Sequence, residues 1–204
     1  MVFHEQSFEI KTLLFISGFA ILSLEILGIR ILAPYVGTTV SVWAALSGVT
    51  LAGSSVGYYG GGVFADYTQK KAVFLWLVAG ASISIALIPL LRSALSVVAP
   101  YFGYSGGALM GAMLLFFVPT MFLSATTTYI IRIFVKNLDT IGQVHGDLYA
   151  LATIGSVAGV FGTSYILVPF FTIPHILYGL TSLIFLLSFS IFLSPSLERG
   201  HRHS

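Results

Sequence analysis

The chain has 204 residues, of which 57% are hydrophobic and only 8% are charged, and its formal net charge is +2. Soluble domains carry about 25% charged residues, so a soluble fold could not cover this much apolar surface. The small net charge does not favour nucleic-acid binding, and the absence of cysteine excludes disulfides and thiolate metal sites. The composition predicts a membrane protein, and at about 20 apolar residues per span the chain has room for six or seven helices.

Six apolar runs follow one another along the chain, separated by short polar or Pro/Gly-rich connections. Because an open sheet edge is unpaired in hydrocarbon and a barrel would show short alternating segments, these runs are predicted to be helices. Their ranges are 12–33, 40–64, 72–91, 106–131, 147–168 and 175–193. The first is expected to be a retained helix, because residues 1–10 contain no basic region of the kind that begins a signal peptide.

We therefore expect an all-α membrane protein with a single transmembrane domain over residues 1–204, a polytopic bundle of about six helices. It could divide into two three-helix halves, 12–91 and 106–193, as transporters often do. The fourth run is long and contains Pro119, and a re-entrant segment around 94–104 is an alternative within this scheme.

Lysine and arginine are distributed unevenly between the two sides of the predicted membrane. With the N-terminus in the cytoplasm, the inner segments contain Lys11, Lys70, Lys71, Arg132, Lys136, Arg199 and Arg202. The outer segments contain Arg30 and Arg92. Because basic residues favour the cytoplasmic side, both termini are predicted to be cytoplasmic.

Small residues recur every four positions in three places. The stripes are Gly53, Gly57 and Gly61 in the second run, Gly103, Gly107 and Gly111 before the fourth, and Gly155 and Gly159 in the fifth. Residues four apart share a helix face and let two backbones approach closely. We expect packing within one subunit, with dimer contacts or a substrate path as the alternatives.

Glu25 is an acidic residue deep within the first predicted span. It follows Lys11 by fourteen residues, about 21 Å along a helix, which places it beyond the middle of the bilayer. Arg30 lies about 140° further around the helix and is a poor partner, although it can extend to the outer headgroups. Glu25 therefore needs a partner from another helix, or it is protonated.

Hydroxyl groups on the second and fourth runs are the available partners for Glu25. Ser47 and Thr50 match its depth, whereas Tyr58 lies nearer the cytoplasmic end, and the hydroxyls of Thr126–Thr128 complete the set. Two interpretations remain open. Glu25 is either a hydrogen-bonded acid that fixes helix packing or a binding site for a cation or proton.

Other polar residues have simpler interpretations. Asp147 begins the fifth run, where helix N-terminal amides would stabilise a carboxylate, so a capping role is predicted. His175 opens the sixth run and is expected to belong to a turn. The hydroxyls of Ser124 and Thr126–Thr128 are expected to bond to backbone carbonyls near Pro119, with a ligand contact as the alternative.

Recognisable catalytic patterns are lacking in the sequence. It contains no nucleotide-binding glycine loop after a strand, no metal-spaced set of His, Asp and Glu, and no Ser/His/Asp set in a plausible order. We identify no catalytic residue and no metal site, and we expect no cofactor.

Two stretches resemble a known family of membrane proteins. The first contains Ser17-Gly18, Glu25, Arg30, Leu32-Ala33-Pro34-Tyr35, Gly37, Val42-Trp43, Gly57-Tyr58-Tyr59-Gly60-Gly61-Gly62 and Asp66. The second runs from His145 to Gly159 and closes with Leu167-Val168-Pro169. Both are similar to the membrane domain of bacterial and archaeal transmembrane spermidine-synthase-like proteins, often labelled fused major-facilitator/spermidine-synthase proteins. The resemblance covers most of the chain.

In that family a soluble Rossmann-like aminopropyltransferase domain commonly follows the helices, and its catalytic motifs have no counterpart here. The resemblance implies a stand-alone module, not catalytic alone, that anchors or partners a separate cytoplasmic aminopropyltransferase in the cytoplasmic (inner) membrane of a bacterium or archaeon. The alternative is a transporter-like half unit for polyamines or other small cations, which would need a homodimer. The candidate residues for contact with a substrate or ion are Glu25, Arg30, Tyr58, Asp147 and Tyr149.

The segment after the second run resembles the cytoplasmic loop signature of major-facilitator transporters. The matching positions are Gly62, Asp66, Lys70 and Lys71. Tyr67 and Gln69 depart from the basic residue and the glycine of that signature. Asp66 could form a charge latch with the two lysines, or the loop could simply be a solvated, positive segment.

Overall fold

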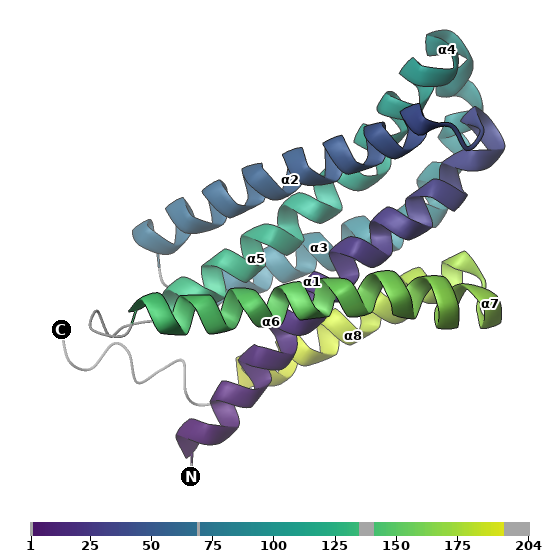
Figure 1. Cartoon of the computed structure of the whole chain (residues 1–204). Coiled ribbons are helices and arrows are strands. Elements are labelled where there is room, and N and C mark those ends of the chain that lie inside the picture. The colour runs from purple at the N-terminus through teal and green to yellow at the C-terminus, as the bar shows by residue number, and fades with distance from the viewer. Residues whose placement is uncertain (1, 69, 135–140, 194–204) are drawn as a thin grey trace.

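The structure is a computed structural model that describes residues 2–68, 70–134 and 141–193, and within them it contains helices and no strand. The α-helices are α1 (Val2–Val36), α2 (Val40–Tyr67), α3 (Lys71–Leu91), α4 (Leu95–Ala112), α5 (Val118–Phe134), α6 (Ile141–Phe161), α7 (Val168–Phe170) and α8 (Ile173–Leu193). Between them lie the 3-10 helix η1 (Arg92–Ala94) and the π-helices η2 (Met113–Phe117) and η4 (Gly162–Leu167). Figure 1 shows the resulting bundle.

Five continuous helical segments of the described chain are long and apolar enough to cross a membrane. They are Phe8–Val36, Val40–Tyr67, Ala72–Arg132, Gly146–Phe170 and Ile173–Ile191. The third has 61 residues, which as one straight helix would measure about 90 Å, three times the hydrocarbon thickness. Instead the chain reverses within α4, and the two arms, α3 and α5, pack against each other (Figure 1). The segments thus make six passes, and the protein is an all-α integral membrane protein, as its sequence predicts.

The reversal occurs at Gly103. Its backbone angles, φ 66° and ψ −177°, are not helical, and glycine adopts them without the steric cost that a Cβ would bring. Gly107 lies against the backbone of Ala99, so the two arms of α4 touch directly. We call the end of the bundle at this turn the Gly103 end, and the end at which α2 meets α3 the Asp66 end.

The sequence predicted a short connection near residues 92–105, whereas the structure contains a helical arm before Gly103. Residues 92–102 are helical and extend α3 towards the Gly103 end. Pro100 lies within this arm, three residues before the turn at Gly103. The segment is therefore a helical continuation of the α3 arm.

The glycine stripe of α2 packs on α5. A Cβ added at Gly57 or Gly61 would collide with the carbonyl oxygen of Met121 or Ala125, respectively. One turn away, Gly53 lies against the Thr120 side chain. The two backbones are therefore in van der Waals contact, which is the main source of helix association where no hydrophobic effect operates between helices.

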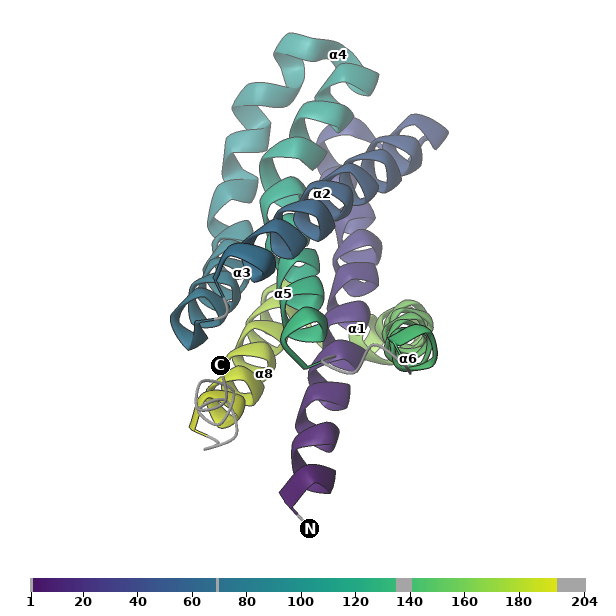
Figure 2. The same cartoon turned by 90° about the vertical axis from the view of Figure 1, so that its left-hand side faces the viewer.

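The glycines of α6 pack on α1 in the same way. Gly155 and Gly159 lie against the carbonyl oxygens of Phe15 and Phe19, and Gly18 of α1 lies against the Ala152 carbonyl of α6. Figure 2 shows α6 at one edge of the bundle, beside α1. The predicted packing of the glycine stripes within one subunit is confirmed for both helix pairs.

The helix pairs are reciprocal between the two halves of the chain. The second pass of the first half, α2, packs on the first pass of the second half, α5, while the second pass of the second half, α6, packs on α1. The third passes, α3 and α8, pack on each other. This is the pattern of contacts that an inverted repeat of three helices would produce.

Both π-helices precede a proline. Pro119 follows η2 and Pro169 follows η4, and because proline has no N–H, each interrupts the helical hydrogen-bond ladder. Near Pro119 the Thr120 hydroxyl lies 2.8 Å from the Phe116 carbonyl oxygen and 3.1 Å from that of Phe117. The Thr120 hydroxyl thus bonds back to carbonyl oxygens of its own helix directly after Pro119.

Candidate functional site

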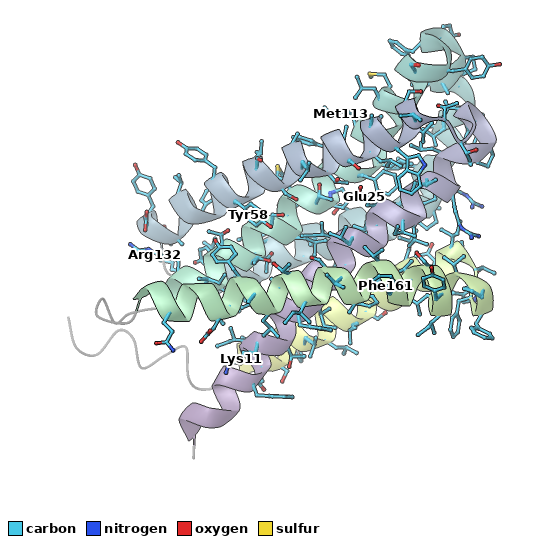
Figure 3. All side chains as sticks on the ribbon, in the orientation of Figure 1. Lys11, Glu25, Tyr58, Met113, Arg132 and Phe161 are labelled. Atoms are coloured by element: carbon cyan, nitrogen blue, oxygen red, sulfur yellow. The ribbon has the colours of Figure 1, made fainter. Side chains whose placement is uncertain are left out.

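Glu25 of α1 contacts α2 through two hydroxyl groups. Ser47 Oγ donates a hydrogen bond to Glu25 Oε1 at 2.5 Å, and Thr50 Oγ1 lies 3.4 Å from Glu25 Oε2. The glutamate is half-buried, and Thr50 is buried. Figure 3 places Glu25 beside α2. The prediction that Glu25 bonds to another helix at the level of Ser47 and Thr50 is confirmed.

The Thr50 hydroxyl also bonds within its own helix. Its oxygen lies 2.9 Å from the Leu46 carbonyl oxygen and 3.1 Å from that of Ser47, both shorter than the 3.4 Å to Glu25 Oε2. A hydroxyl has one proton to donate, and the shortest contact receives it. The Leu46 carbonyl is therefore the favoured acceptor, and the Thr50 contact to the Glu25 carboxyl group is the weaker one.

No basic side chain pairs with Glu25 among the residues that the structure describes. Arg30 is exposed and lies five residues further along α1, consistent with a side chain that extends to the membrane surface. The ion pair recorded in the described ranges joins Arg132 to Asp66 at the other end of the bundle. Within the described part of the chain, the polar contacts of the Glu25 carboxyl group are thus hydroxyl groups alone.

The π-helix η2 borders the Glu25 contact. One turn along α1, Gly28 lies against the Phe116 ring of η2, and one turn along α2, Gly53 lies against the Phe117 carbonyl. The contact between Glu25 and α2 is thus flanked on both helices by residues that touch η2. Because π-helical turns occur frequently at functional sites, this neighbourhood is the best-defined candidate site in the described chain.

The other sequence candidates do not join this site. Tyr58 lies eight residues beyond Thr50 on α2, about 12 Å further toward the Asp66 end, and its side chain is largely exposed (Figure 3). Tyr149 is exposed on α6, the helix at the edge of the bundle.

The capping role predicted for Asp147 is wrong. Helix α6 begins at Ile141, six residues earlier, so Asp147 lies in its second turn and its side chain is exposed. The polar residues before the apolar run continue the helix beyond the hydrocarbon, where hydropathy alone does not reveal a helix start. His145 lies in the same turn, but its side chain is outside the described part of the structure.

Asp66 is paired with an arginine from a distant part of the chain. Arg132 Nε of α5 donates to Asp66 Oδ1 of α2 at 2.8 Å, and both side chains are exposed. The Asp66 latch thus joins α2 to α5, whereas the sequence hypothesis paired Asp66 with the neighbouring lysines. Gly62 lies one turn before Asp66, beside Thr128 of α5. Lys70 is exposed, and the side chain of Lys71 is outside the described part.

Tyr129 is a site residue that sequence reasoning missed. Its fully buried side chain places the hydroxyl 2.6 Å from the Thr68 carbonyl oxygen and 2.9 Å from that of Lys70. One aromatic side chain of α5 therefore holds the connection between α2 and α3 in place. The available signal was a tyrosine on a buried helix face, because a buried Tyr hydroxyl needs a partner.

The hydroxyl cluster of α5 behaves partly as predicted. Thr126 and Thr127 donate to the carbonyl oxygens four residues earlier, at 2.8 and 3.0 Å. Ser124 and Thr128 are buried without a hydrogen-bond partner among the described residues. At the start of α8, Thr172 Oγ1 lies 2.5 Å from His175 Nδ1. His175 is helical, in the first turn of α8, so the expectation that it belongs to a turn between helices is wrong.

A buried hydrogen bond also joins η4 to α1. Thr163 donates to the Ser23 hydroxyl at 2.7 Å, two residues before Glu25. The described spans therefore place two polar contacts within one turn of α1, one to α2 and one to η4. Comparison of the chain with protein-family models, curated proteins and solved structures finds no match.

Proposed function

We propose that this protein is a transporter-like membrane unit for a small cation and that Glu25 binds the cation. The observation that carries the proposal is a carboxyl group at membrane depth that is bonded only to hydroxyls of α2, with no basic partner in the described chain. Insertion scales assign about 2.5–3.5 kcal/mol to an acidic residue at the centre of a span. A neutral side chain could hold α1 and α2 together without that cost, which favours a functional role for the charge.

The reciprocal helix pairing supports the same proposal. Transporters are often built from inverted repeats, with the binding site where the repeats meet. Glu25 belongs to the first half, while η2, which borders its contact, belongs to the second. Movement of one half against the other would therefore change the surroundings of Glu25.

Ion flux in proteoliposomes tests the proposed function. The wild-type chain should carry a cation current with at least one of Na⁺, K⁺, Ca²⁺ or putrescine, and Glu25→Gln should abolish it while folding normally. Glu9→Gln is the matched control, because Glu9 lies near the end of α1 and bonds to Ser190 of α8. Equal flux through Glu25→Gln and wild type, or no flux through the wild type, would contradict the proposal.

The Asp66 end favours a second candidate function, that of a docking module for a separate cytoplasmic aminopropyltransferase. The supporting observation is a charged surface with a fixed backbone, in which Tyr129 holds the α2–α3 connection while Lys70 and Arg132 remain exposed. In this proposal the Asp66 end faces the cytoplasm of a bacterium or archaeon. Co-purification of a soluble synthase with the wild type, but not with a Lys70→Glu/Arg132→Glu variant, would support it.

A further inference from the structure

We propose that Glu25 and Thr50, with Ser47 holding the carboxyl group, form a binding site for one monovalent metal cation, Na⁺, and that this site rejects divalent cations and polyamines. This inference rests on the proposed function, because it names the cation that the Glu25 site would take.

The two carboxylate oxygens of Glu25 are not equivalent. Oε1 accepts a hydrogen bond from Ser47 at 2.5 Å, whereas Oε2 faces Thr50 Oγ1 at 3.4 Å. The Thr50 hydroxyl oxygen also lies 2.9 Å from the Leu46 carbonyl oxygen. Because the same hydroxyl has a closer acceptor, the 3.4 Å contact to Oε2 is at most a weak hydrogen bond, so lone pairs of both Oε2 and Oγ1 remain available to a positive charge.

The distance between Oε2 and Thr50 Oγ1 suits a metal ion better than a proton shared between these two oxygens. A proton on Oε2 would have to bond across 3.4 Å, whereas O–H···O bonds measure about 2.5–3.0 Å. Hard cations such as Ca²⁺ bind oxygen at roughly 2.3–2.6 Å, and Na⁺ is similar in size. For an ion about 2.4 Å from both oxygens, the O–ion–O angle would be about 90°, which is normal for six-fold coordination.

The charge count selects a monovalent ion. Within the described spans Glu25 is the one carboxylate at membrane depth, since Glu9, Asp66 and Asp147 lie near the helix ends. One monovalent cation neutralises Glu25. A divalent ion would leave an uncompensated charge at low dielectric, which costs several kcal/mol. A polyamine would leave at least one uncompensated charge for the same reason.

Packing around the contact favours a small ion. On the side of the Gly103 end, Gly28 lies against the Leu46 side chain and the Phe116 ring, so α1, α2 and η2 are in direct contact one turn from Glu25. A Cβ at Gly28 would lie only 2.7 Å from Leu46 Cδ2. A flexible chain of several methylene groups could not pass between the helices there without separating them.

Direct binding measurements on the purified full chain test this site. The probes are radioactive Na⁺ in a choline chloride background, with K⁺, Ca²⁺ and putrescine as competitors. We expect saturable Na⁺ binding that Ca²⁺ and putrescine do not displace. Glu25→Gln should abolish binding, and Thr50→Val should weaken it by about tenfold or more, the effect of losing about 1.4 kcal/mol.

Paired variants separate a lost ligand from a lost fold. Thr50→Ser keeps the hydroxyl oxygen and should bind Na⁺ within a few-fold of the wild type, whereas Thr50→Val has the shape of threonine without it. Thr153→Val is the control, because its hydroxyl lies on α6 and bonds to the Tyr149 carbonyl of its own helix. If Thr50→Val binds Na⁺ as Thr50→Ser does, Thr50 is not a ligand and the site is wrong.

Failure of the inference can be distinguished from failure of the proposed function. Glu25-dependent binding of Ca²⁺ or putrescine without Na⁺ binding would overturn the monovalent site and leave the cation-transport proposal standing. Stabilisation of the wild type by low pH alone, with no effect of Na⁺, would replace the metal ion with a proton and also overturn the inference. If no cation depends on Glu25, both proposals fail.

Discussion

Tyr129 of α5 and Thr68 at the end of α2 are 61 residues apart, and a hydrogen bond of 2.6 Å joins the tyrosine hydroxyl to the threonine carbonyl. The same hydroxyl also lies 2.9 Å from the Lys70 carbonyl. Two consecutive passes, α2 and α3, are therefore connected by a loop whose conformation depends on a side chain from a third helix.

The variant Tyr129→Phe should destabilise the protein by about 1 kcal/mol, the usual net value of one hydrogen bond. The phenyl ring keeps the packing, so the lost hydroxyl is the only change. Thermal unfolding in detergent measures the effect, with Tyr59→Phe as the control because Tyr59 is exposed on α2. Equal melting temperatures for Tyr129→Phe and the wild type would show that the loop does not depend on this hydroxyl.

Alanine at Gly57 or Gly61 should destabilise the bundle by about 1–3 kcal/mol, the usual cost of overpacking. The added methyl group would collide with a carbonyl oxygen of α5, and backbone atoms cannot move aside as a flexible side chain can. Gly60→Ala is a matched control on the same helix, because a Cβ there meets nothing within 4 Å.

Unlike alanine at Gly57 or Gly61, the control Gly60→Ala should not lower the stability of the bundle. Alanine is favoured over glycine in a helix by about 0.8–1.0 kcal/mol, so Gly60→Ala should leave stability unchanged or raise it. Three equal melting temperatures would contradict the close approach of α2 to α5.

The exposed ion pair between Asp66 and Arg132 should contribute less than about 1 kcal/mol. A double-mutant cycle with Asp66→Asn and Arg132→Gln, measured by unfolding at low and high salt, gives the coupling energy. We expect a small coupling that decreases as salt is added, because exposed charges are screened. A coupling above about 2 kcal/mol would mean that the pair is desolvated in the membrane-bound protein.

Single cysteines introduced at Thr38 and Lys70 should report the orientation. The chain contains no cysteine, and both positions are exposed, one at each end of the bundle. If the Asp66 end is cytoplasmic, an impermeant maleimide will label Thr38→Cys in intact cells, and Lys70→Cys only after permeabilisation. The opposite labelling pattern would invert the proposed topology.

Regular features of the fold could be predicted because they leave periodic signals. Apolar runs mark the passes, and glycines four apart mark the faces on which α2 and α6 pack. The partner of Glu25 was also predictable. Only a short turn separates the helix of Glu25 from the helix of Ser47, so the depth of each residue in the membrane can be counted from that turn.

The missed features depend on long-range contacts or on backbone geometry. The pair of Asp66 and Arg132 and the bond from Tyr129 to Thr68 each join residues about 60 apart, and no local pattern specifies them. The start of α6 at Ile141 was missed because a helix that continues into water loses its hydropathy signal. The π-helices were missed because an extra residue in a helix leaves composition unchanged.

The extra residue in η2 determines which neighbouring helices the arm formed by α4, η2 and α5 can contact. In a regular α-helix each residue turns the chain by about 100°, so Gly111 and Thr120, nine residues apart, would point in nearly opposite directions. The wider π-turn reduces the rotation between Gly111 and Thr120 by about the amount that one residue contributes, so the two positions point at roughly a right angle to each other. Gly111 can then meet Leu32 of α1 while Thr120 meets Gly53 of α2, two helices that stand side by side. The π-turn thus changes the rotational phase of the helix, so that the arm formed by α4, η2 and α5 can pack against both α1 and α2.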